Sequence, residues 1–96
     1  MGAQAFYTRA RGKTAREAFQ NEVDDAQYEH GHGGYTGTIA EKGNFTLIAV
    51  PEGEVPEDFA ERLVEAADPR VNDKWGPAGC VRIGEGEWLF FGWASS

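Results

Sequence analysis

Four positively charged side chains stand close together near the start of the chain and could bind an anion. The first sixteen residues contain no Asp or Glu and carry four bases: Arg9, Arg11, Lys13 and Arg16. Guanidinium and ammonium groups bind phosphate and carboxylate oxygens. A helix predicted to start at Thr14 would direct free backbone N–H groups at the same place. The sequence therefore predicts an anion-binding site around this turn.

Aromatic side chains in glycine-containing stretches could stack on a planar ligand. Trp75 follows Lys74 and precedes Gly76-Pro77, a setting that favours an exposed ring. Tyr35 follows a glycine-rich stretch and is a second candidate. The alternative for Trp75 is a ring that covers the core. The candidate ligand-binding set is Arg9, Arg11, Lys13, Thr14, Tyr35, Lys74 and Trp75.

Two histidines in a glycine loop are weak candidates for a metal site or for hydrolysis. His30 and His32 are separated by one residue, and Glu29 could supply a carboxylate. The alternative is that the surrounding glycines end a helix and leave both rings in solvent. As a catalytic base, either ring would need an orienting acid that the spacing does not supply. Cys80 is the single cysteine, and we expect it to be buried rather than nucleophilic.

The positions of these residues depend on seven predicted elements in the order βαββαββ. Alternating apolar and polar residues, together with turn residues, predict five strands over Ala3–Arg9, Tyr35–Glu41, Phe45–Val50, Cys80–Ile83 and Trp88–Trp93.

Apolar residues at spacings of three and four predict two helices, one from Thr14 to about Glu29 and one from Pro56 to Asp68. Thr14 and Glu17 fit a capping box, in which the hydroxyl accepts from the Glu17 amide and the carboxylate accepts from the Thr14 amide. In the second helix we expect Phe59, Leu63, Val64 and Ala67 to form the buried stripe.

This order predicts an α+β two-layer sandwich. We expect an antiparallel sheet of four to five strands with both helices on one face, ferredoxin-like with an extra C-terminal strand. In that topology Lys42, Arg70 and Lys74 would join the N-terminal cations at one edge. The alternative is that these bases only solubilise loops. The strand Trp88–Trp93 is apolar on both faces, so it lies either between two layers or against a second subunit.

The whole chain is short and acidic. Its 96 residues contain nine Lys and Arg against sixteen Asp and Glu, a formal net charge of −7. This length predicts a single domain over residues 1–96. The charge, and the poor fit of Lys42–Ala49 to an RNA-recognition motif, argue against nucleic-acid binding. Without a membrane span or a signal peptide at its start, the chain is expected to be cytoplasmic.

Three segments resemble parts of a group of small bacterial and phage proteins: Gly31–Ile39, Lys74–Gly79 and Phe91–Ser95. The group has no established activity, so the resemblance assigns no functional residue. It implies a role against host defences, because small acidic phage proteins often sequester a nucleotide signal or occupy the surface of a host protein.

Three functions are consistent with these features. The first is a non-enzymatic protein, dimeric through its C-terminal strand, that sequesters an anionic, nucleotide-like small molecule. The second is an inhibitor whose acidic face binds a basic host protein. The carboxylates of that face would be Glu52, Glu54, Glu57, Asp58, Glu61 and Glu65. The third is a small hydrolase that uses His30 or His32 as a base. We expect no cofactor in any of the three.

Overall fold

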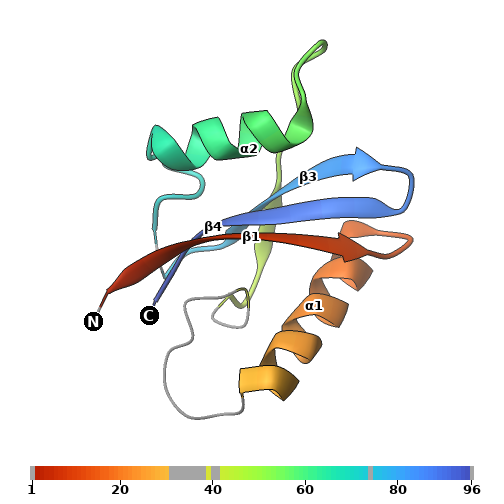
Figure 1. Cartoon of the computed structure of the whole chain (residues 1–96), viewed down its shortest axis with the longest axis vertical. Coiled ribbons are helices and arrows are strands. Elements are labelled where there is room, and N and C mark those ends of the chain that lie inside the picture. Colours follow the sequence, from red (N-terminus) through yellow and green to blue (C-terminus); the bar gives the residue numbers. More distant parts are fainter. Residues whose placement is uncertain (1, 31–38, 40–41, 74, 96) are drawn as a thin grey trace.

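Four strands and two helices form the part of the chain that the structure describes (Figure 1). The computed structural model describes residues 2–30, 39, 42–73 and 75–95, with residues 27, 29, 30 and 95 as backbone only. The elements follow one another in the order β1 (Ala3–Arg11), α1 (Ala15–His30), β2 (Phe45–Leu47), α2 (Pro56–Glu65), β3 (Ala78–Gly84) and β4 (Glu87–Ser95).

The four strands form one mixed sheet in the order β1-β4-β3-β2. The pairs β1–β4 and β4–β3 are antiparallel, whereas β2 and β3 run parallel. The prediction of a wholly antiparallel sheet is therefore wrong. Helix α2 carries the chain back to the starting end of the sheet, so that β3 must run in the same direction as β2. The α+β class is confirmed, but the ferredoxin-like order and the fifth strand are not.

The two helices cover opposite faces of this sheet, as Figure 1 shows. Successive side chains of a strand point to opposite faces. On β4, Phe90 packs into the cluster that contains Phe19 of α1, while Phe91 packs into the cluster that contains Leu63 of α2. The prediction of both helices on one face is wrong, because β3 and β4 carry apolar residues on both faces and each face needs a cover.

This arrangement explains the apolar C-terminal strand without a second subunit. Leu89, Phe90 and Phe91 are all buried within the described chain. Of the two alternatives for this strand, a position between two layers is the one observed. The strand no longer argues for a dimer, and dimerisation stays an untested prediction.

Helix α1 begins as the capping motif predicts, with one difference. The Glu17 amide donates to Thr14 Oγ1 at 3.1 Å. The Glu17 carboxylate accepts from the amide of Lys13 at 3.2 Å, and not from that of Thr14. Both bonds satisfy groups that would otherwise lack partners near the start of the helix.

The predicted strand Tyr35–Glu41 lies, apart from Ile39, outside the described residues. Ile39 is buried against α1 and β4, and its carbonyl accepts from the Lys42 amide at 3.0 Å. The following strand is shorter than predicted, although the Ile48 amide still donates to Cys80 O at 2.8 Å and so extends the β2–β3 ladder by one bond.

Helix α2 starts at Pro56 as predicted, but it ends earlier than expected. Ala67 has φ +54°, a left-handed conformation that stops the helix. The amides of Ala67 and Asp68 donate to the Val64 and Leu63 carbonyls, as in a Schellman motif. Ala67 is therefore exposed and is not part of the buried stripe, which Ala60 joins instead.

Candidate functional site

The first group of predicted cations lies at one end of the sheet, where β1 joins α1. Here the Gly12 amide donates to Gly86 O at 3.1 Å, and the Trp88 indole N–H donates to Gly12 O at 3.0 Å. The turn that carries Lys13 and Thr14 is thus held against the β3–β4 hairpin.

The second group of predicted cations lies at the other end of the sheet, before β2 and β3. Lys42 is 3% exposed, and its Nζ donates to the carbonyls of Asp73 at 3.1 Å and Gly76 at 2.9 Å. Burial lowers the pKa of the Lys42 ammonium, and the nearby Asp73 acts in the opposite direction. This lysine holds a loop in place, so its ammonium is already engaged by the chain itself.

The predicted gathering of cations at one edge is therefore wrong. Gly79, the second residue of β3, and Tyr7 of β1 both lie opposite Phe91. The start of β3 is thus about four to five residues of strand, roughly 15 Å, from Arg11 at the end of β1. A mixed sheet with β2 parallel to β3 sends the loops before these strands to the end away from the β1–α1 turn. Lys74 and Tyr35 lie outside the described residues.

The arginines of the predicted site contact carboxylates of the chain. Arg9 pairs with Glu57 at 3.1 Å, and Arg11 pairs with Glu87 at 3.5 Å. Arg16 lies over the ring of Phe45, 5.8 Å from its centroid. Exposed pairs of this kind add little stability, but they offset the positive charge that an anion would need.

Arg70 makes the tightest of these contacts. Its Nε and Nη2 donate to the two oxygens of Asp68 at 2.9 and 3.1 Å, and its amide donates to Asp68 Oδ1. These bonds lower the pKa of Asp68 and raise that of Arg70. Arg70 therefore stabilises the turn after α2.

Of the two alternatives for Trp75, an exposed ring and a ring that covers the core, the exposed ring is the one observed. Its side chain is 64% exposed, and its amide donates to Asp73 Oδ1 at 2.8 Å. It lies in the loop that Lys42 holds, away from Arg9, Arg11 and Lys13. Trp75 and the N-terminal cations are therefore not brought together around one small ligand.

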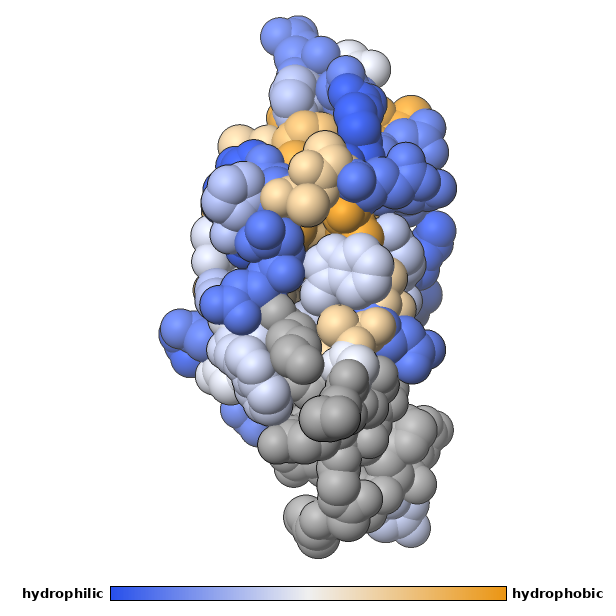
Figure 2. All heavy atoms as spheres, turned by 90° about the vertical axis from the view of Figure 1, so that its left-hand side faces the viewer, coloured by the Kyte–Doolittle hydropathy of each residue, from blue (hydrophilic) through white to orange (hydrophobic). Residues whose placement is uncertain are grey.

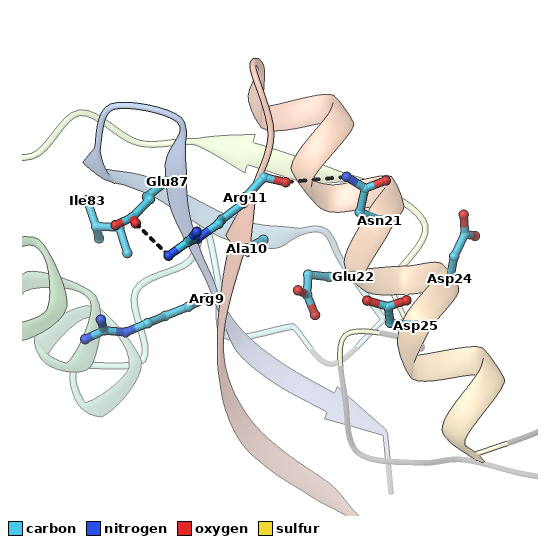
Figure 3. A pocket seen from close by; sticks show the side chains of 9 residues that line it. All are labelled: Arg9, Ala10, Arg11, Asn21, Glu22, Asp24, Asp25, Ile83 and Glu87. Carbon is cyan, nitrogen blue, oxygen red and sulfur yellow. Dashed lines mark hydrogen bonds and ion pairs between the residues drawn. The ribbon is translucent and has the colours of Figure 1, made fainter.

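A groove of about 710 Å³ runs between α1 and the outer strand β1 (Figure 3). It is lined by Arg9, Ala10, Arg11, Asn21, Glu22, Asp24, Asp25, Ile83 and Glu87. Glu22 and Asp25 lie on the side of α1 that faces β1, and Asn21 Nδ2 donates to Arg11 O at 3.4 Å. Its lining includes four carboxylates and two arginines, so the groove is acidic.

A smaller hollow of about 220 Å³ lies on the other side of β1, against α2. Its lining residues are Tyr7, Arg9, Glu57, Glu61 and Leu89. Burial raises the pKa of Tyr7, and the carboxylates of Glu61 and Glu65 raise it further. Carboxylates from both helices therefore face β1, one set on each side.

The pKa of Tyr7 provides a test of this negative field. In Glu61→Gln we expect the Tyr7 pKa to fall toward 10 while staying above it, because burial is the largest cause of the increase. Residue-specific NMR titration of the tyrosine rings measures it. The matched control is Glu85→Gln, in the β3–β4 turn, which should leave the Tyr7 pKa unchanged. Equal shifts in both variants would contradict a local origin.

The structure tests the prediction for Cys80 and part of the metal-site hypothesis. Cys80 is fully buried, and burial raises the pKa of its thiol to about 12, so it is not a nucleophile at neutral pH. Among the described residues, no three His, Cys, Asp or Glu side chains come together as a metal site. The His30 side chain and the whole of His32 lie outside that part, and the metal and hydrolase hypotheses stay predictions.

The convergence of the acids of the two helices on β1 is not evident from the residue pattern. One signal was present: Glu57, Glu61 and Glu65 recur every four residues, which places them along one side of α2. The side of α1 that carries Glu22 and Asp25 lies outside the helix's apolar stripe, a pattern that by itself predicts exposure to solvent. Only the packing of α1 beside β1 shows that these two acids line a groove.

Comparison of the chain with protein-family models, with curated proteins and with solved structures found no match.

The face seen in Figure 2 carries apolar side chains in a narrow strip bordered by hydrophilic ones. Neither helix of the described chain is both long enough and apolar enough to cross a membrane.

Proposed function

We propose that this protein binds a basic segment of another protein through the carboxylates that face β1. One observation carries the proposal: acids of α1 and α2 lie on both sides of the same strand. Asp25 and Glu61 represent the two sides, and the negative charge of the whole chain adds to the attraction over a distance. Such complementarity mainly speeds association and selects the partner.

Sequestration of an anionic, nucleotide-like molecule is the weaker proposal. The cations predicted to gather at one edge lie at two ends of the sheet, and Arg9, Arg11 and Arg70 contact carboxylates. An anion would have to displace these acids and approach a chain of charge −7. A basic host protein is accordingly the partner that the charge distribution favours, and a role against host defences would depend on what that partner does.

The test compares the position of acids at constant net charge. The variant Asp25→Asn/Glu61→Gln removes one carboxylate from each side of β1, whereas Glu52→Gln/Glu85→Gln removes two elsewhere. Both variants carry a formal charge of −5 instead of −7. The wild-type protein is used to recover a partner from host extract. We expect the amount of that partner recovered to fall about tenfold or more with the first variant and to stay unchanged with the second.

A third variant, Arg11→Glu/Lys13→Glu, separates the two proposals. A basic partner should still bind it, whereas an anionic small molecule, followed by native mass spectrometry, should not. Equal partner loss with both neutralised variants would show a dependence on net charge alone and would contradict the proposed site.

A further inference from the structure

Strand β1 forms one outer edge of the sheet and is long. It pairs with β4 along nine residues, from Ala3 to Arg11, and has no second strand beside it in the described chain. The opposite edge is β2, with only three residues. An edge strand presents a row of backbone N–H and C=O groups that another strand can bind. Of the two edges, β1 offers about three times the length for such pairing.

The register identifies the backbone groups that point outward. Gly12, one residue beyond β1, donates to Gly86 O, and the pairing with β4 is continuous from there to Ala3. Because bonded and non-bonded positions alternate in an antiparallel pair, Ala5, Tyr7 and Arg9 direct their N–H and C=O groups away from β4. In the described structure no hydrogen bond reaches these outward groups.

Carboxylates flank this open edge on both faces. Asp25 lines the groove on the α1 side, and Glu61 lines the hollow on the α2 side. The side chains of a strand added beside β1 would alternate between these two faces. Lys or Arg would therefore meet a carboxylate on either face, whereas Asp or Glu would be repelled.

We infer that an extended, Lys- or Arg-rich segment of a partner protein adds as a fifth strand to the open edge of β1. This inference rests on the proposed function and adds the conformation and place of the bound segment. Main-chain hydrogen bonds hold the segment, and the flanking acids select its basic side chains. A second copy of this chain is disfavoured as the occupant, because two chains of charge −7 would bring the same carboxylates together.

The test uses a synthetic nine-residue peptide, as long as β1. Some of its odd and some of its even positions are Lys, so that lysines point to both faces, and the remaining positions are Val. Its control is the same peptide with alternate backbone amides N-methylated, which keeps the charge but removes strand donors. We expect the first peptide to bind at least tenfold more tightly by fluorescence anisotropy. Hydrogen exchange should slow at the Ala5, Tyr7 and Arg9 amides on binding.

A pair of variants tests the same contact from the protein side. Arg9→Pro removes an outward N–H, a change that edge strands tolerate, and Arg9→Ala removes the same guanidinium while keeping that N–H. We expect Arg9→Pro to weaken peptide binding about tenfold relative to Arg9→Ala. Circular dichroism and thermal unfolding verify that both variants fold. If Arg9→Pro does not fold, the N-methylated peptide and the hydrogen-exchange data still test whether the segment binds as a strand.

Each outcome separates this inference from the proposed function. If both peptides bind equally and Asp25→Asn/Glu61→Gln alone abolishes binding, the acidic site stands and strand addition is overturned. If the peptide binds the Asp25→Asn/Glu61→Gln variant as tightly as it binds the wild type, the proposed acidic site is overturned too. If the β1 amides become protected with rising protein concentration and no peptide, a second copy occupies the edge and the basic segment is excluded.

Discussion

Replacing Phe90 by Ala is expected to lower the free energy of unfolding by about 3–5 kcal/mol. Phe90 is fully buried on β4, and its ring lies 5.4 Å from that of Phe19 on α1 and 5.5 Å from that of Phe45 on β2. The truncation therefore leaves a cavity where three elements meet. A domain of this size has only about 5–15 kcal/mol of net stability, so the loss removes a substantial fraction of it.

Chemical denaturation followed by far-ultraviolet circular dichroism measures this loss. Phe90→Leu keeps most of the side-chain volume and should lose less than half as much stability. Tyr28→Ala, at a side chain that is 92% exposed, should stay within about 0.5 kcal/mol of the wild type. A Phe90→Ala protein as stable as Tyr28→Ala would contradict the position of β4 between two packed layers.

Gly12→Ala is expected to lower stability by about 1–3 kcal/mol, an unusual cost for one methyl group. A Cβ at Gly12 would lie 2.6 Å from the backbone nitrogen of Ala18 and 3.0 Å from its Cα. Because these are backbone atoms of α1, no side-chain rotation can relieve the overlap. The turn must move, and the bonds from the Gly12 amide to Gly86 O and from the Trp88 indole to Gly12 O must lengthen.

Gly43→Ala is the matched control, since no atom of the described residues lies within 4 Å of a Cβ at Gly43. We expect its stability to equal or slightly exceed that of the wild type. NMR of the Trp88 indole N–H gives a second readout, because only Gly12→Ala should shift that resonance. Equal stability of the two variants, with an unmoved indole signal, would contradict the close approach of α1 to this turn.

The local structure of this protein can be predicted from short stretches of its sequence. Three predicted features each depend on residues within a few positions of one another. They are the helix start at Thr14, the start of α2 at Pro56 and the hairpin around Gly84–Gly86. Capping bonds and turn conformations are short-range interactions, so neighbouring residue types are enough to predict them. Burial of Cys80 was likewise predicted correctly, because a free cysteine is among the residue types that are most often buried.

The order of the strands and the positions of the charges depend on long-range packing. Ala3 pairs with Ser95, and Lys42 reaches the carbonyls of Asp73 and Gly76, across separations that no local pattern encodes. Charged side chains are hydrated equally well on many parts of a protein surface. Their positions in the sequence therefore do not show which elements they will face. The acids of α1 and α2 converge on β1 only because the two helices pack on opposite faces of one sheet.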